Sequence, residues 1–112
     1  MIFRGMVQRG SGYGRKLGFP TANIPCPDDA LSGIYAAWVR HDDTTHAAAV
    51  YVDTKRKLLE AHLLDVDLDL YGKEIEMTLV RKIREDRTFE SAEEAKATIA
   101  ADVDAVRAVL RV

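Results

Sequence analysis

The chain has 112 residues, 47% hydrophobic and 30% charged, a composition typical of a single globular domain rather than a disordered segment. The single cysteine, Cys26, cannot form an internal disulfide, so a reducing, cytoplasmic location is expected. Arg4 interrupts the apolar start, and no later apolar run has the length of a membrane span. Neither a membrane segment nor a signal peptide is therefore expected.

The formal net charge of -2 argues against a dedicated nucleic-acid-binding protein, whose contact face usually carries an excess of lysine and arginine. The charge is unevenly distributed, because residues 1 to 27 contain four basic residues and no acid while the rest of the chain carries -6. The small positive region surrounds a glycine-rich run. We expect a monomer that acts on small molecules, with neither nucleic acid nor membrane as a partner.

Alternation of apolar and polar residues predicts a series of short strands joined by turn-rich connectors. In chain order these segments cover 3 to 8, 21 to 24, 34 to 40, 47 to 52, 58 to 64 and 74 to 84. A five-residue polar turn, 41 to 45, is expected between the third and fourth. In the last strand the alternation places Ile75, Met77, Leu79 and Ile83 on one face. Short strands at this spacing favour an antiparallel barrel or sandwich.

A single helix is predicted at the C-terminal end. Ser91 and Glu94 have the spacing of a capping box, in which each side chain bonds the backbone of the other residue. Apolar residues then recur with helical period, which predicts a helix to about residue 110 with one stripe packed on the barrel. The stripe consists of Ile99, Val103, Val106 and Leu110.

The glycine-rich run lies between the first two predicted strands and is expected to be irregular. Gly10, Gly12 and Gly14 are followed by Arg15 and Lys16, so the run offers flexible backbone amides and positive charge, which favour an anion such as phosphate. The spacing fits neither a dinucleotide-binding fingerprint nor a Walker loop. A plain hairpin turn with solvated charges remains the alternative.

Two oxygen-bearing side chains follow this run. If residues 21 to 24 are extended, Thr21 and Asn23 point to the same face, where a hydroxyl and an amide oxygen could share a hard cation such as magnesium. Both residue types are also common in turns beside a proline such as Pro20, which is the alternative role.

Polar residues also share one face of the fifth predicted strand. Glu60 and His62 alternate with Leu59, Ala61 and Leu63, so the polar pair is available to a site. A carboxylate held on a strand could act as a general base, although an exposed strand glutamate has the same pattern. The three histidines, His41, His46 and His62, lack the spacing of zinc ligands.

The glycine-rich run and the Gly18-Phe19-Pro20-Thr21-Ala22-Asn23 segment closely resemble the riboflavin kinase family. Three further segments agree in the same order and extend the resemblance over nearly the whole chain. They are Ser32 to Tyr35, Glu60 to Asp65 with Asp69 to Lys73, and Ile83 to Glu85 with Phe89 to Ser91. The resemblance implies that residues 1 to 112 form one domain, a six-stranded antiparallel Greek-key barrel with a C-terminal helix.

The resemblance also implies an activity, the transfer of the γ-phosphate of ATP to the 5′-hydroxyl of riboflavin to give FMN and ADP with Mg²⁺. Glu60 aligns with the catalytic base of the family, and Thr21 and Asn23 align with its metal site. The implied nucleotide-binding residues are Gly10, Gly12, Gly14, Arg15, Lys16, Gly18, Pro20, Thr21 and Asn23. The implied flavin-binding residues are His62, Arg84, Glu85 and Phe89. Phe89 could instead be a hydrophobic staple ahead of the helix, and Arg84 a helix-flanking charge.

One segment departs from the family. Where riboflavin kinases usually have a Gly-x-Asn/Arg-Pro turn and a longer loop, residues 50 to 57 contain neither glycine nor proline. A flavin- or nucleotide-binding barrel without turnover is therefore an alternative function, and a small barrel that binds single-stranded nucleic acid is another. The chain starts directly at the barrel, so the adenylyltransferase half of many bacterial relatives, and with it FAD synthesis, is not expected.

Overall fold

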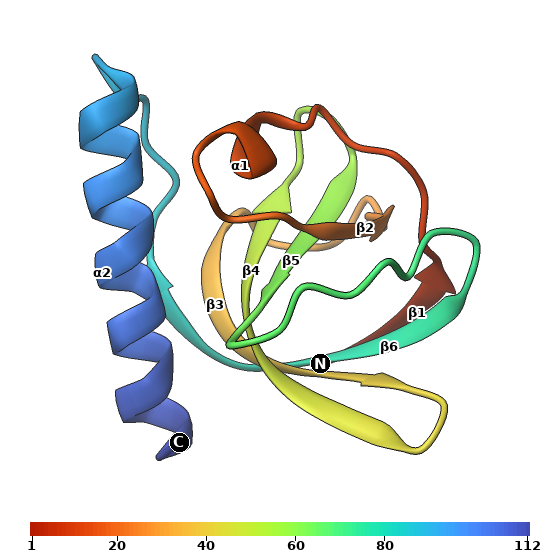
Figure 1. The fold of residues 1–112 in the computed structure, drawn as a ribbon. Coiled ribbons are helices and arrows are strands. Elements are labelled where there is room, and N and C mark those ends of the chain that lie inside the picture. Colours follow the sequence, from red (N-terminus) through yellow and green to blue (C-terminus); the bar gives the residue numbers. More distant parts are fainter.

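The computed structural model describes all residues from Met1 to Val112, which form six strands and two helices (Figure 1). The strands form one antiparallel sheet and the long C-terminal helix stands against its outer surface. In chain order the elements are β1 (Ile2–Met6), α1 (Tyr13–Lys16), β2 (Ala22–Pro25), β3 (Gly33–His41), β4 (Thr44–Asp53), β5 (Leu58–Leu63), β6 (Glu74–Arg84) and α2 (Ala92–Leu110).

The sheet has the strand order β1-β6-β3-β4-β5-β2. Strands β3, β4 and β5 follow one another, and β6 returns to lie beside β3, which is a Greek-key arrangement. The two edge strands approach each other where the Gln8 N–H donates to the Asn23 carbonyl, 2.8 Å away. The sheet is thus a nearly closed barrel, and the predicted mainly β fold with one long C-terminal helix is confirmed.

The barrel interior is the main core. Ile24, Val39, Leu59, Ile75 and Met77 are fully buried there, because each occupies an inward position in a strand with two-residue alternation. A second, smaller cluster lies between the barrel and α2 and contains Ala36, Ala49, Leu64 and Val106. Neither helix combines the length and apolarity that a membrane crossing requires.

Several element boundaries differ from the predictions. The β3–β4 hairpin is longer than expected, because the turn comprises just Asp42 and Asp43, with Asp42 at a φ of 50°. The polar residues at its tip therefore pair across the strands instead of forming a five-residue loop. The glycine-rich run is not wholly irregular, since Tyr13–Lys16 closes one helical turn directly after Gly12.

In β6, the prediction that Ile83 lies on the same face as Ile75, Met77 and Leu79 is wrong. Ala36 pairs with Arg81 but Ala37 pairs with Leu79, so β6 contains an extra residue, and the register shifts again beside Ile34 and Tyr35. Each shift interrupts the strict alternation of side chains. Ile83 therefore packs against the cluster beneath α2, whereas Met77 lies inside the barrel.

Helix α2 begins at the predicted cap and ends at the predicted residue. The Ser91 Oγ accepts a hydrogen bond of 3.0 Å from the Glu94 N–H. The Glu94 carboxylate does not return to Ser91; it accepts from the Glu90 N–H at 3.4 Å and pairs with Arg87. The buried face of the helix also contains Asp102, which the apolar pattern did not predict.

Candidate active site

A cavity of about 440 Å³ opens between the barrel wall, α1 and the loop that joins β6 to α2. It receives side chains from segments far apart in the sequence, both aromatic and charged. Of the predicted site residues it brings together Gly14, Thr21, Glu60, His62, Arg84 and Phe89. The mixture of flat apolar surfaces and convergent polar groups is typical of a small-molecule site.

Glu60 lies in the middle of a row of side chains that crosses three strands. It pairs with Tyr51 of β4 on one side and with Asn23 of β2 on the other, so all three side chains point to the same face of the sheet. Burial raises the pKa of the Glu60 carboxyl, the carboxylate of Asp53 raises it further, and the positive charge of Arg56 opposes the shift. A carboxyl group in this setting is a stronger base than a solvated glutamate.

Tyr51 connects the barrel wall to the loop after β6. Its hydroxyl donates to the Oδ2 of Asp86 at 2.8 Å. Burial and this hydrogen bond raise the pKa of the Tyr51 phenol, so the hydroxyl stays protonated and remains a donor. The loop from 85 to 90 is thereby tied across the cavity to β4.

Thr21 and Asn23 lie together as predicted. The Thr21 hydroxyl donates to the Asn23 Oδ1, and the two oxygens are 2.8 Å apart. Adjacent oxygen ligands of an octahedral magnesium ion lie about 2.9 Å apart, so the two atoms fit two neighbouring positions of such an ion once the hydroxyl proton turns away. Asn23 is buried at 5% exposure and Thr21 lines the cavity. These residues could therefore hold a magnesium ion.

The glycines of the N-terminal loop allow close packing around this pair. A side-chain carbon on Gly10 would lie 2.4 Å from the Asn23 amide nitrogen, and one on Gly14 would lie 2.5 Å from the Phe19 carbonyl oxygen. Gly12 and Gly18 have φ values of 76° and 89°, which other residues rarely adopt. The loop thus folds tightly onto the Thr21 segment.

His62 holds the same segment from the barrel side. The carbonyl of Pro20 can only accept, so the His62 Nδ1, 2.9 Å away, carries the proton and donates. The His62 ring also meets Phe19 edge to face, with a centroid distance of 5.3 Å. His62 therefore positions the loop, and it also lines the cavity.

Arg84 and Phe89 line the cavity beside α2. Arg84 makes two hydrogen bonds of 2.8 Å to the carboxylate of Asp102, and its guanidinium lies 5.8 Å from the centre of the Phe89 ring. Arg87 approaches the same ring at 5.2 Å and pairs with Glu94 at 2.5 Å. The aromatic ring is thus held next to two guanidinium groups, each fixed by an acid of α2.

Other predicted residues do not line the cavity. Arg15 pairs loosely with Asp67 at 3.7 Å, Lys16 is exposed, and Glu85 pairs with Lys82 at 2.7 Å. The cavity is also not lined by Gly10, Gly12, Gly18, Pro20 or Asn23.

The sequence interpretation missed several lining residues, among them Tyr51, Asp53, Asp86 and Asp102. The sequence contained a signal for Asp102, because an acidic residue on the apolar stripe of a helix is buried and needs a positively charged or hydrogen-bonding partner. No local pattern marked the other three.

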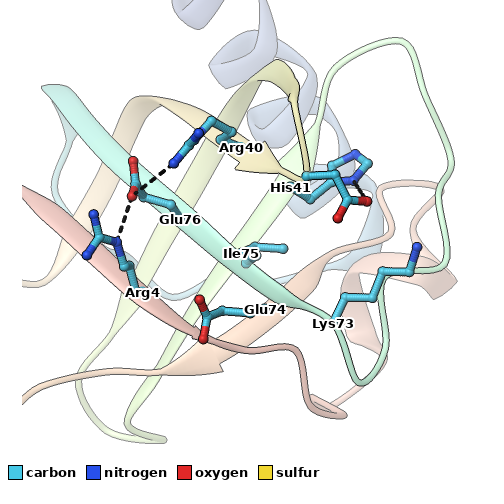
Figure 2. A pocket seen from close by; sticks show the side chains of 8 residues that line it. Arg4, Arg40, His41, Lys73, Glu74, Ile75 and Glu76 are labelled. Carbon is cyan, nitrogen blue, oxygen red and sulfur yellow. Dashed lines mark hydrogen bonds and ion pairs between the residues drawn. The ribbon is translucent and has the colours of Figure 1, made fainter.

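A larger hollow of about 580 Å³ lies away from these residues (Figure 2). Seven of its eight lining residues are polar, and the two arginines at its rim, Arg4 and Arg40, both pair with Glu76. It contains none of the predicted site residues and one hydrophobic side chain, Ile75. The smaller cavity is therefore the candidate active site.

The chain is similar to several known proteins. The family model "Flavokinase: Riboflavin kinase" matches residues 1–110. The bifunctional riboflavin kinase/FMN adenylyltransferase of Escherichia coli is 39% identical over 107 residues, which cover 88% of this chain and 34% of that protein. The RNA-binding riboflavin kinase RibR of Bacillus subtilis is 35% identical over 113 residues, which cover 94% of this chain and 49% of RibR. The chain thus spans about a third to a half of the length of these relatives.

Solved structures share the fold. A macrolide-efflux protein from Streptococcus pneumoniae superimposes with a TM-score of 0.81 and 26% identity, over 95% of this chain and 38% of that one. The riboflavin kinase from Trypanosoma brucei superimposes with a TM-score of 0.73 over 98% of this chain and 76% of that one, and its 23% identity bears on the fold alone. With a family model that matches almost every residue and a barrel that agrees with it, the chain belongs to the riboflavin kinase family.

Proposed function

We propose that this chain is an ATP:riboflavin 5′-phosphotransferase that produces FMN and ADP. The observation that carries the proposal is the convergence of Glu60, Thr21 and Phe89 on one cavity, although they come from three separate segments of the chain. A carboxylate can act as the general base, an oxygen pair can hold the cation, and a flat aromatic surface can stack on a flavin, so the three groups together suit phosphoryl transfer to a flavin. Family membership gives independent support.

The aromatic end of the cavity is the proposed flavin site. Phe89, Tyr51 and Ile99 offer apolar surface to a planar ring, and Arg84 offers N–H donors at its edge. A flavin in that position directs its ribityl chain along the barrel wall towards Glu60. His62 serves mainly to hold the Pro20 carbonyl, and the carboxylate of Glu85 pairs with Lys82 and does not contact the proposed flavin.

The glycine-rich loop and the Thr21 segment form the proposed nucleotide end. A magnesium ion held by Thr21 and Asn23 would neutralise negative charge on the phosphates of ATP. Gly10 and Gly14 let the loop approach the segment closely, and Arg15 and Lys16 add positive charge outside the cavity. Backbone amides in such a loop suit phosphate oxygens.

The proposed chemistry depends on Glu60. Its carboxylate accepts the proton of the ribityl 5′-hydroxyl while that oxygen forms a bond to the γ-phosphorus and the bond from that phosphorus to ADP breaks. The raised pKa of Glu60 makes its carboxylate more basic. The strand pairs on both sides, to Asn23 and Tyr51, hold the base between the two proposed substrate ends.

The test is to incubate the purified chain with riboflavin, ATP and magnesium and to separate the flavins afterwards. FMN is expected when all three are present and in none of the reactions that omit one of them. Flavin binding without FMN would instead favour the non-catalytic barrel suggested by the altered 50 to 57 segment.

The same preparation tests the proposed restriction to small molecules. The RibR relative is named as RNA-binding, whereas this chain carries a net charge of -2. We expect no salt-sensitive complex with single-stranded RNA at physiological ionic strength. A complex that persists at this ionic strength would contradict this part of the proposal. The proposed monomer is tested separately by size-exclusion chromatography, where elution as a dimer would contradict it.

A further inference from the structure

Asp102 is a charged residue in an apolar setting. It lies on the buried face of α2 near Val106, with 5% of its surface exposed. A carboxylate in such a position is costly unless it is paired and hydrogen-bonded, and Arg84 of β6 supplies both requirements. The pair therefore joins the C-terminal helix to the barrel at the edge of the cavity.

The geometry of this pair restricts the guanidinium of Arg84. Its Nε and Nη2 each donate at 2.8 Å to a different oxygen of Asp102, and its Nη1 donates to the Glu85 carbonyl at 3.0 Å. A guanidinium has five N–H donors in a rigid plane, so two donors stay free and their directions are fixed. Arg84 and Asp102 both line the cavity, beside Phe89.

We propose that Asp102 is a positioning residue for the flavin, which holds Arg84 so that its two free N–H donors meet the carbonyl oxygens at the edge of the isoalloxazine ring beside Phe89. The inference rests on the proposed function. It adds that α2 is a wall of the substrate site and controls the affinity for riboflavin. Without the bidentate partner, the guanidinium rotates and the donors lose their alignment.

The ion pair between Asp102 and Arg84 could also act by holding α2 on the barrel, and a second ion pair of α2 provides a control for that role. Arg107, nearer the end of α2, makes a bidentate ion pair with Asp65 of the loop after β5, and neither residue lines the cavity. Loss of that pair weakens the attachment of the helix without changing the donors at the site. Asp104 is an exposed acid of the same helix and controls for the loss of a charge.

The experiment measures riboflavin affinity from the quenching of flavin fluorescence, for the unmodified chain and for Asp102→Asn, Asp104→Asn and Arg107→Gln. Asp102→Asn is expected to raise the dissociation constant roughly tenfold, the equivalent of one hydrogen bond, while the KM for MgATP stays the same. The two control variants are expected to bind riboflavin like the unmodified chain. Thermal unfolding of each variant reports any loss of stability.

A second variant covers the case in which Asp102→Asn does not fold. Arg84→Lys keeps the positive charge opposite Asp102 but lacks the planar fork, so the same tenfold loss is expected. Unchanged riboflavin affinity in a folded Asp102→Asn variant would overturn the inference, as would an equal loss in Arg107→Gln. If the unmodified chain binds riboflavin without making FMN, the proposed function fails while this test still decides the inference. If it binds no riboflavin, both fail.

Discussion

Replacement of Glu60 by glutamine separates the proposed chemistry from binding. Glutamine preserves the volume of the side chain and one acceptor oxygen, so the row formed with Asn23 and Tyr51 should remain intact. The variant cannot accept the hydroxyl proton. We expect it to bind riboflavin and MgATP as before and to turn them over much more slowly.

The expected loss is roughly a hundredfold or more in kcat, the range of a positioned general base. A hundredfold corresponds to about 2.7 kcal/mol of transition-state stabilisation, at about 1.36 kcal/mol for each factor of ten. Both KM values should change little, because the interaction is made mainly in the transition state. FMN formation, followed by flavin separation at saturating substrates, measures kcat directly.

The same variant reports on the environment of the carboxyl group. Burial, together with the Asp53 carboxylate, raises the pKa of Glu60 above its value in the unfolded chain, so the folded state binds this proton more tightly. The associated stability is present below the unfolded pKa and is lost as the pH rises through the folded pKa. Glu60→Gln should therefore match the unmodified chain in acid and exceed its thermal stability at neutral pH.

Two outcomes would refute this reasoning. Turnover close to the original rate would make Glu60 an ordinary strand residue and leave the transfer to the glycine-rich loop and the proposed cation alone, which a loose transition state permits. A variant less stable than the unmodified chain at neutral pH would contradict the described environment of the carboxyl group. As a control, the circular dichroism spectra of the unmodified chain and of Glu60→Gln should superimpose, which shows that both are folded.

Three further predictions concern other parts of the molecule. Thr21→Ala and Asn23→Ala should each raise the magnesium concentration needed for half-maximal activity, and unchanged dependence in both would remove the metal assignment. Gly14→Ala places a carbon against the Phe19 carbonyl and should raise the KM for MgATP at least tenfold with little effect on riboflavin binding, which steady-state kinetics can check. Burial, assisted by nearby acids, raises the pKa of the Cys26 thiol. A thiol reagent at pH 8 should therefore label Cys26 slowly until denaturant is added. Rapid labelling of the folded chain would contradict the buried position of Cys26.

The sequence predicted the six strands well because apolar residues recur at the inward positions along them. The alternation in β5 placed Leu59, Ala61 and Leu63 inside and Glu60 with His62 outside, and the structure confirms it. The same reasoning was wrong for Ile83, because a bulge interrupts the alternation and is invisible to a count of apolar residues. It also missed α1, since a single helical turn has no periodicity to detect.

The sequence by itself determined the family, the mainly β class, the C-terminal helix and the motif around Thr21, since these depend on local residue order and short-range periodicity. The tertiary structure alone decided which distant residues share the cavity. Strand register set Asn23, Glu60 and Tyr51 in one row, and helix docking brought Asp102 to Arg84. These contacts arise from pairing and packing between segments far apart in the chain, so no local pattern contains them.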